Sequence, residues 1–349
     1  MRNFKDHLIL KGSSIKSALE QLNNLASDAI LFVVDEHNKL IGSVTDGDIR
    51  RGLLKEIGIE QQVETLCQGN PRFVTKGDVY LDQIVNYRSQ SITIIPILTK
   101  DHIVTNVINL RHLRSYLPVD VVIMAGGRGS RLRPLTDTVP KPLLKVGGKP
   151  IIEHNIERLA LYGIDDFWLS INYLGYQLRE YFSTGRERNV HIEYIEESEP
   201  LGTIGSIALI EEFHHDFIMV TNSDILTNLD YEHFFLEFIS NDSDLSVVTI
   251  PYKVNIPYAV IETADGRTIS DFKEKPTYTY YSNGGIYLMK RSVIDIIPHS
   301  KFYNATDLME EMIKKGMKVT SYPFEGYWLD IGKHEDFKKA QEDIIKIRF

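Results

Sequence analysis

The chain has 349 residues, enough for two or three domains, and its 43% hydrophobic and 25% charged residues are typical of a soluble globular protein. Its formal net charge of -9 disfavours a general nucleic-acid or anionic-membrane partner, because both of these partners are themselves negatively charged. A single cysteine, Cys67, excludes an internal disulfide framework, and the absence of a signal-peptide pattern or a ~20-residue apolar run leads us to expect a cytoplasmic protein.

The first third of the chain alternates helical and strand patterns in an order that repeats. Apolar residues at helical spacing predict a helix over residues 13–26. Two strands, at Ala29–Val34 and Leu40–Val44, and a short helix follow it. The same order recurs in weaker form downstream and ends in a helix predicted at Leu110–Tyr116. An internal repeat of about 60 residues is the simplest account.

A specific resemblance lies within the first repeat. The string LIGSVTDGDIRR, residues 40–51, resembles the end of a CBS (cystathionine-β-synthase-type) motif, and the repeat resembles a tandem pair of such motifs. In that family a pair binds adenine nucleotides and regulates an attached domain, which implies that Thr45 contacts phosphate and Asp48 contacts ribose. The alternative is that both residues only cap the following helix. The second copy has different residues at the matching positions, namely Asn106, Asn109 and His112. At most one nucleotide site is therefore expected, and a module used only for packing or oligomerisation is the other interpretation.

Pro118 interrupts the preceding helical pattern and predicts a domain boundary. We expect a regulatory module at residues 1–117, with halves at about 1–58 and 59–117, and a second domain at residues 118–349. In the second domain strands and helices alternate, which indicates an α/β fold on a mixed, mostly parallel sheet with ligands at the carboxyl ends of its strands. The predicted strands are Val119–Met124, Phe167–Ile171, Val190–Ile195, Phe217–Thr221, Leu245–Ile250, Tyr258–Glu262, Gly285–Met289 and Val319–Tyr322. The predicted helices are Ile151–Tyr162, Gly205–Glu212, Tyr231–Ser240, Thr306–Lys315 and His334–Lys346.

A glycine-rich turn follows the first of these strands. Its glycines fit neither the dinucleotide-binding nor the P-loop spacing, but consecutive backbone N–H groups beside Arg131 and Lys141 form a receptacle for a polyphosphate. The strings AGGRGSRLRPLT (125–136) and PKP (140–142) together resemble the signature of the sugar-1-phosphate nucleotidyltransferases. The resemblance implies a Rossmann-like nucleotidyltransferase domain in which Arg131 holds the phosphates and Lys141 supports the α-phosphate region. The nucleotide-binding residues that it implies in the turn are Ala125, Gly126, Gly127, Gly129 and Ser130.

A second string, EESEPLGTIG at residues 196–205, resembles the turn that in this family presses against the base and the sugar. The resemblance implies nucleotide-binding roles for Glu197 and for Gly202, where the missing side chain lets backbone come close. An ionised carboxylate only accepts hydrogen bonds, and guanine offers two adjacent donor groups where uracil and thymine offer one. Glu197 therefore favours guanine, although a solvated carboxylate among neighbouring glutamates is the alternative.

Two distant strings supply aspartates. TNSD at residues 221–224 resembles the family's N-G-D, with Ser223 in place of the common glycine, and WLDIG at residues 328–332 resembles its W-x-D-[IV]-G. The resemblance implies that Asp224 and Asp330 bind Mg²⁺, a cation that prefers oxygen ligands. The histidines at 214, 215 and 299 lack metal-type spacing and are predicted to be surface residues.

Between the two aspartates lie FKEKP at residues 272–276 and NGGIY at residues 283–287, which resemble the sugar-phosphate-binding strings of the family. This implies that Glu274 accepts hydrogen bonds from sugar hydroxyls and that Lys275 binds the phosphate of the sugar. It also implies that Asn283 and Gly285 close over the ring. Without this context, residues 273–275 are typical of a solvated run of charges.

Together the resemblances imply an enzyme that transfers a nucleotidyl group from a nucleoside triphosphate to a sugar 1-phosphate, with Mg²⁺ as cofactor and Arg131, Lys141 and Lys275 as catalytic residues. A CBS pair ahead of such a domain resembles a bacterial group that makes GDP-glucosamine for legionaminic-acid synthesis, so GTP and glucosamine 1-phosphate are expected. The alternatives are a UTP- or dTTP-dependent hexose-1-phosphate enzyme and a catalytically inactive nucleotide sensor. We expect a homo-oligomer.

Overall fold

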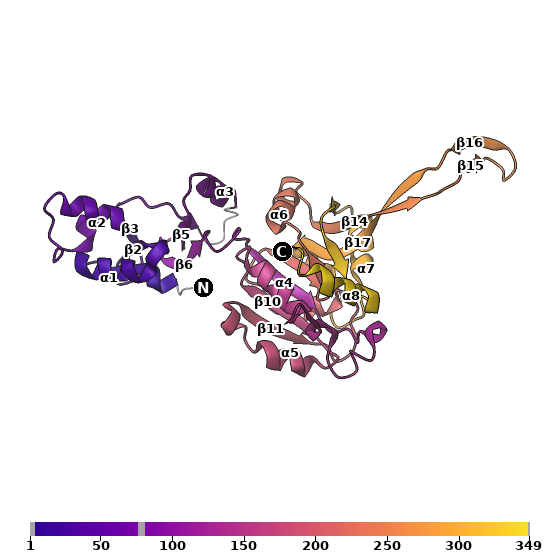
Figure 1. Ribbon diagram of the computed structural model, residues 1–349, viewed down its shortest axis with the longest axis horizontal. Coiled ribbons are helices and arrows are strands. Elements are labelled where there is room, and N and C mark those ends of the chain that lie inside the picture. The colour runs from indigo at the N-terminus through magenta and orange to yellow at the C-terminus, as the bar shows by residue number, and fades with distance from the viewer. Residues whose placement is uncertain (1–3, 76–80, 348–349) are drawn as a thin grey trace. The chain divides into compact units, whose positions relative to one another are not determined.

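The computed structural model describes residues 4–75 and 81–347, so the outer ends of both predicted domains lie outside the described residues (Figure 1). The chain divides into two compact units. The first contains Met1–Pro118 with Ala160–Gly163, and the second contains Val119–Leu159 with Ile164–Phe349. Among the described residues, no helix combines the length and the apolar character that crossing a membrane requires.

The first unit contains two small sheets of the same topology. In each sheet a parallel pair of strands is followed by an antiparallel pair, in the orders β1-β2-β3 and β4-β5-β6. The strands are β1 (Leu8–Leu10), β2 (Ile30–Val34), β3 (Leu40–Thr45), β4 (Val74–Thr75), β5 (Ile94–Leu98) and β6 (Val104–Asn109). The helices are α1 (Ile15–Leu25), α2 (Asp46–Leu53) and α3 (Leu81–Ser89). This duplication agrees with the internal repeat that the sequence predicts.

The helix predicted at Leu110–Tyr116 is wrong, because the chain continues from β6 in turns. The backbone N–H of Arg114 donates to the carbonyl oxygen of Leu161 (2.6 Å), and that of Leu117 donates to the carbonyl oxygen of Tyr162 (2.9 Å). Donors that an α-helix directs to its own preceding turn are thus used in tertiary contacts.

The second unit is organised on a seven-stranded sheet in the order β11-β10-β7-β12-β17-β14-β18. Its strands are β7 (Val119–Met124), β10 (Asp166–Ile171), β11 (His191–Glu196), β12 (Phe217–Asn222), β14 (Leu245–Asn255), β17 (Thr277–Lys290) and β18 (Val319–Pro323). Strand β17 runs antiparallel to both of its neighbours, and the remaining pairs are parallel. The predicted fold class, a mixed and mostly parallel α/β domain preceded by an α+β module, is confirmed.

The α-helices of the second unit agree with the prediction except at two places. They are α4 (Ile151–Ala160), α5 (Gly175–Phe182), α6 (Tyr231–Ser240), α7 (Ala305–Lys314) and α8 (His334–Asp343). The sequence prediction missed α5. It also placed a helix at Gly205–Glu212, where the structure has a short 3-10 turn at Gly205–Leu209. The N–H groups of Ile204 and Gly205 donate to the carbonyl oxygen of Tyr303 (3.2 Å each), which fixes the entry to this turn by a tertiary contact.

Strands β14 and β17 continue beyond the sheet as a two-stranded ribbon, and β15 (Val260–Thr263) pairs with β16 (Ile269–Lys273) at its end (Figure 1). We call residues 251–282 the arm. The strand predicted at Gly285–Met289 is only the inner part of β17, and the strand predicted at Tyr258–Glu262 lies at the tip of the arm as β15.

A partly buried pair of Asp120 and His215 anchors the start of β7. Asp120 is fully buried, and its carboxylate accepts hydrogen bonds from the backbone N–H of His215 (2.9 Å) and from its ring Nδ1 (2.7 Å). Burial lowers the pKa of His215, but the Asp120 carboxylate outweighs this effect, with smaller contributions from Asp166 and Asp165, and the pKa is raised. Because the pKa of the folded state exceeds that of the unfolded state, the stabilisation is complete below the unfolded pKa of about 6.5 and is lost as pH rises through the folded pKa.

We therefore expect the free energy of unfolding to contain a contribution from His215 that declines as pH rises from about 6.5 through the raised pKa of the folded state. His215→Asn keeps a donor toward Asp120 but no titrating ring, so it should remove this decline and cost about 1–2 kcal/mol at pH 6. Urea denaturation at several pH values measures both effects. His299→Asn, at an exposed histidine, is the matched control and should leave the pH profile unchanged. An unaltered profile in His215→Asn contradicts the assignment.

Candidate active site

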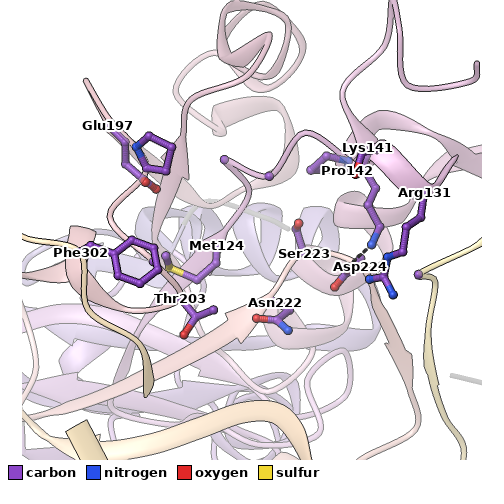
Figure 2. A pocket seen from close by; sticks show the side chains of 17 residues that line it. Met124, Arg131, Lys141, Pro142, Glu197, Thr203, Asn222, Ser223, Asp224 and Phe302 are labelled. Atoms are coloured by element: carbon purple, nitrogen blue, oxygen red, sulfur yellow. Dashed lines mark hydrogen bonds and ion pairs between the residues drawn. The ribbon is translucent and has the colours of Figure 1, made fainter. Parts of the chain in front are cut away.

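A cavity of about 380 Å³ lies at the carboxyl ends of β7 and β12, the edge at which parallel strands place ligands (Figure 2). It brings together residues from Met124 to Gly332, which lie far apart in the sequence. The sequence-predicted residues that line it are Gly126, Gly127, Gly129, Ser130, Arg131, Lys141, Glu197, Gly202 and Asp224. Most of the predicted nucleotide-binding set therefore shares one cavity.

The glycine-rich turn folds tightly against the segment that carries Lys141. Gly129 has a left-handed φ of 59°, and a Cβ added to it would lie 3.0 Å from Cβ of Lys141 and from Cγ2 of Thr136. The hydroxyl of Thr136 also donates to the carbonyl oxygen of Gly129 (2.9 Å). Ala125 is buried and does not line the cavity. Its N–H donates to the carbonyl oxygen of Ser170 (2.8 Å) and continues the pairing of the sheet.

The cavity has a charged end. There the ammonium group of Lys141 forms an ion pair with the Asp224 carboxylate, and Arg131 lies beside that pair (Figure 2). The side chains of Lys141 and Asp224 are only 11% and 18% exposed, so water screens this pair less than it screens a surface pair. Arg131 also packs against Gly332, where an added Cβ would lie 3.3 Å from its guanidinium.

Two short strands bring the two predicted metal ligands together. Strand β13 (Ile225–Thr227) directly follows Asp224 and pairs antiparallel with β19 (Trp328–Asp330), with Ile225 opposite Asp330. The backbone N–H of Ile331 donates to the carbonyl oxygen of Asp224 (3.0 Å), and the indole N–H of Trp328 donates to that of Gly284 (2.9 Å). Both aspartates are thereby fixed by backbone pairing.

The chemistry of this carboxylate pair fits a divalent cation. Burial raises the pKa of Asp330, and the nearby Asp224 charge raises it further, while Lys141 and Arg131 act in the opposite direction. Asp224 Oδ1 and Asp330 Oδ1 are both buried, and neither has a hydrogen-bond partner among the described residues. Buried carboxylate oxygens without donors are what a Mg²⁺ ion binds.

The other end of the cavity is less charged and contains Glu197 beside Phe302 and Met124 (Figure 2). Glu197 is 7% exposed. Its Oε1 accepts from the Ser170 hydroxyl, and its Oε2 accepts from the backbone N–H of Leu201 (3.0 Å). Glu197 thus fixes the turn that leads to Leu201, and it is not the freely solvated carboxylate of the alternative interpretation.

Gly202 meets a protein neighbour as well as the cavity. Its φ is +83°, and an added Cβ would lie 2.5 Å from the carbonyl oxygen of Tyr303. This packing brings the loop with Phe302 to the cavity. Phe302, Thr203 and Asn222, the last of which ends β12, are among the lining residues that were not predicted from the sequence. Asn222 stands two residues before Asp224, which is a usable signal, whereas no motif marks Phe302.

The predicted sugar-phosphate residues are divided between two places. Gly285 does not itself line the cavity, but it packs against the lining residue Asn222, since an added Cβ would be 2.6 Å from Nδ2 of Asn222. Asn283 is held nearby, with its Oδ1 accepting from Gly285 N–H (2.9 Å) and its Nδ2 donating to the Tyr287 hydroxyl (2.8 Å). Glu274 and Lys275 are exposed on the arm and do not line the cavity.

In the first unit, Thr45 and Asp48 form a capping box at the start of α2. The Asp48 carboxylate accepts from the Thr45 N–H (2.9 Å) and hydroxyl (2.6 Å), and also from Arg51 (2.6 Å) and Gln68 (3.0 Å). Burial raises the pKa of Asp48, but the hydrogen bonds outweigh it and lower the pKa. The helix-capping interpretation therefore describes what these residues do in this structure.

Outside the cavity, the structure assembles a group that sequence spacing did not predict. Potential ligand atoms of Asp166, His191 and His214 lie within 4.8 Å of one another. His191 is exposed, and its Nδ1 lies 3.3 Å from Asp166 Oδ1. These residues come from different strands and loops, so no local sequence signal brings them together. Of the histidines predicted at the surface, His214 and His299 are exposed, whereas His215 is partly buried because it pairs with Asp120.

Comparisons with known proteins agree with this geometry. The family profile described as nucleotidyl transferase matches residues 120–347, and the CBS domain profile matches residues 8–55. A mannose-1-phosphate guanylyltransferase of Mycobacterium tuberculosis is 31% identical over 65% of this chain and 65% of its own length. A UTP–glucose-1-phosphate uridylyltransferase of Synechocystis is 29% identical over 64% of this chain and 63% of its own length. The match thus covers somewhat less than two thirds of the length of each of these relatives.

Among solved structures, HddC from Yersinia pseudotuberculosis, complexed with GMP-PN, matches with a TM-score of 0.50 and 28% sequence identity. The match covers 64% of this chain and 99% of HddC. It therefore extends over nearly the whole of that protein.

The charges of Asp224 and Asp330 should make the thermal stability of the protein depend on pH and on divalent cations. Since the folded state holds the Asp330 proton more tightly than the unfolded state does, ionisation of Asp330 costs stability above its folded pKa. We expect Asp330→Asn to raise the melting temperature at about pH 7.5 without divalent cation. We also expect Mg²⁺ at about ten times its Kd to stabilise the wild type by about 1.4 kcal/mol and to have little effect on the variant.

Thermal unfolding with EDTA and with MgCl₂ measures both effects. Asp295→Asn, at an exposed aspartate, is the control and should behave as the wild type. A lower melting temperature for Asp330→Asn in EDTA, or an equal Mg²⁺ effect in both proteins, contradicts the assignment.

Proposed function

The chain belongs to the nucleotidyl transferase family, and we propose that it transfers a nucleotidyl group from a nucleoside triphosphate to a sugar 1-phosphate, which gives a nucleotide sugar and pyrophosphate. The observation that carries this proposal is the cavity with a glycine turn, Arg131 and Lys141 at one end and two carboxylates with donor-free buried oxygens beside them. Such a site suits a polyphosphate with a bound cation.

The reaction needs no side-chain nucleophile. A phosphate oxygen of the sugar 1-phosphate attacks the α-phosphorus in line, and the bond from that phosphorus to the bridging oxygen of pyrophosphate breaks. Arg131 and Lys141 stabilise the negative charge that develops on the departing pyrophosphate. Asp224 and Asp330 would hold Mg²⁺, which would neutralise phosphate charge when bound. The backbone of the turn at 125–130 orients the triphosphate.

We propose GTP as the nucleotide. Each Glu197 oxygen accepts one hydrogen bond from the protein, and a carboxylate has further acceptor positions for the N1–H and N2–H₂ donors of guanine. The guanylyltransferase relative and the nucleotide complex of HddC support this choice. The uridylyltransferase relative favours the second candidate, a UTP- or dTTP-dependent hexose-1-phosphate enzyme. An inactive nucleotide sensor is disfavoured because Arg131, Lys141 and both aspartates are all present.

We propose glucosamine 1-phosphate as the acceptor, because a CBS domain ahead of a nucleotidyl transferase domain resembles the bacterial group that makes GDP-glucosamine for legionaminic-acid synthesis. Glu274, Lys275, Asn283 and Gly285 bind this acceptor in the proposal, with Lys275 placing the attacking phosphate. Because both substrates are phosphorylated metabolites, we place the enzyme in the cytoplasm. We also propose that it works as a homo-oligomer.

Regulation by an adenine nucleotide is a separate proposal for the first unit. The CBS match at residues 8–55 supports it, and Thr45 and Asp48 stand at the N-terminus of α2, where phosphate is favoured. In this proposal the nucleotide competes with the internal hydrogen bonds of the capping box.

A pyrophosphate-release screen of four nucleoside triphosphates against a panel of sugar 1-phosphates tests the main proposal. We expect turnover with GTP and glucosamine 1-phosphate, and a loss of about 10²-fold or more in kcat for Asp224→Asn, because a charge-stabilising group is removed. Asp295→Asn is the control. Turnover by Asp224→Asn at the wild-type rate would falsify the role of the carboxylate pair.

The base preference is tested with Glu197→Gln. The amide replaces one acceptor by a donor, so kcat/KM for GTP should fall by about 10-fold to 10²-fold relative to UTP. A variant that is equally impaired with every nucleotide indicates that Glu197 only holds its turn. The circular dichroism spectrum and melting temperature of the variant show whether the turn is intact.

The regulatory proposal is tested by titrating AMP, ADP and ATP into the full chain by calorimetry. We expect one of them to bind, and Thr45→Ala to weaken that binding and to destabilise the first unit by about 1 kcal/mol through loss of the cap. Thr45→Ser keeps the hydroxyl and is the matched control. No binding by the wild type, with unchanged kinetics, reduces this unit to a structural role.

A further inference from the structure

The arm has the surface of an interface. Its five aromatic side chains of largest exposure are between 60% and 76% exposed, namely Tyr252, Tyr258, Phe272, Tyr280 and Tyr281. Two isoleucines near its tip, Ile261 and Ile269, are 56% and 61% exposed. Large apolar side chains gathered on one element in this way mark a contact surface.

The arm also lacks neighbours among the described strands. Strand β18 pairs with β14 only as far as Thr249, and β12 pairs with β17 only over residues 286–290. Beyond these points β14 and β17 pair with each other alone, so both outer edges present free backbone donors and acceptors. An isolated two-stranded ribbon is marginally stable in water, which favours a partner that covers it.

The available area matches a stable dimer. Each of the seven exposed side chains covers on the order of 100 Å² when it is buried, which gives about 700 Å² from each copy, close to the ~800 Å² per partner of a standard interface. Residues 251–282 contain four Lys and Arg and four Asp and Glu, so the arm is neutral in a chain of net charge -9. Two copies can therefore meet through this surface without charge repulsion. The same neutral surface has no electrostatic attraction for an anionic membrane or for a nucleic acid.

The arm carries two of the four predicted sugar-phosphate residues, Glu274 and Lys275, and neither of them lines the cavity. Thr277 is six residues out from Asn283 along β17, which corresponds to about 20 Å at ~3.3 Å per residue, and Glu274 and Lys275 lie further out. The described cavity contains Arg131 and Lys141 as its cations, and both are already placed at the pyrophosphate side. Among its described residues, the cavity of a single chain thus has no further cationic group that could bind the phosphate of the acceptor.

We propose that the arm of each copy docks on a second copy of this chain and delivers Glu274 and Lys275 to the sugar-phosphate side of the partner copy's cavity. The inference rests on the proposed function. The exchange is reciprocal, as two-fold symmetry requires, so each dimer has two complete sites. Lys275 of one copy then holds the phosphate whose oxygen attacks the α-phosphorus bound in the other.

Subunit mixing tests the exchange. Asp224→Asn has a defective cavity and an intact arm, and Lys275→Met has the reverse, so each alone should lose about 10²-fold or more of the wild-type rate. After co-expression with two different tags and purification of the mixed species, one site of each heterodimer combines an intact arm with an intact cavity. We expect about half of the wild-type rate per heterodimer, or about a quarter for a random mixture.

The controls separate the alternatives. A mixture of Asp224→Asn with Lys141→Met, both in the cavity, should remain inactive. If Asp224→Asn with Lys275→Met also stays inactive while the wild type turns over, the arm folds onto its own chain and the proposal is overturned. If the wild type releases no pyrophosphate with any substrate pair, the proposed function fails instead.

A second measurement does not depend on activity. Ultracentrifugation of the full chain should show a dimer, and the double variant Phe272→Ser, Tyr280→Ser should shift it to monomer, whereas Tyr176→Ser, at an exposed tyrosine outside the arm, should not. A wild-type monomer at the concentrations used for the assay overturns the proposal.

Discussion

The candidate site depends on two carboxylates that are held together although their charges repel. Asp224 follows β12, and Asp330 ends β19, and the backbone pairing of β13 with β19 leaves them no freedom to separate. The cost appears in the raised pKa of Asp330 and in the two buried oxygens without donors. Lys141 and Arg131 offset part of this repulsion. The two carboxylates that suit a metal ion and the two cationic side chains that suit phosphate groups therefore form one electrostatic cluster.

Sequence reasoning located this cluster because its signals are local. A strand that ends in glycines is followed by Arg131 and then Lys141, and Asp224 follows a strand that the apolar pattern marks. No strand is predicted at Asp330, which is selected only because residues 328–332 resemble a family string. The parallel sheet brings the ends of β7 and β12 to one edge, which follows from topology and needs no knowledge of side-chain contacts. Asp330 joins them through the separate antiparallel pair of β13 and β19. For the same reason the fold class was predictable, and so was the duplication in the first unit.

What sequence reasoning could not predict is set by tertiary contacts. The segments at Leu110–Tyr116 and Gly205–Glu212 have helical patterns, but their backbone donors bond to distant carbonyl groups, so local propensity is overridden. Phe302 reaches the cavity only because Gly202 packs on Tyr303. The capping box of Thr45 with Asp48 illustrates a different limit, because one short string satisfies both a nucleotide-binding pattern and a helix N-terminus.

The arm shows how one motif can be correct in type and unexpected in position. In the sequence, residues 272–276 stand between the two aspartates, which suggests a place inside the same cavity. In the structure β14 and β17 extend beyond the sheet, and residues 272–276 therefore lie on the arm, away from the cavity. A rigid, charge-lined cavity suits the leaving group, whose charge must be met by fixed groups. An exposed ribbon suits the acceptor, because its aromatic surface needs a second copy before Lys275 meets any substrate. Under the proposed exchange, assembly and acceptor binding are therefore the same event, and a monomer retains only the nucleotide half of the site.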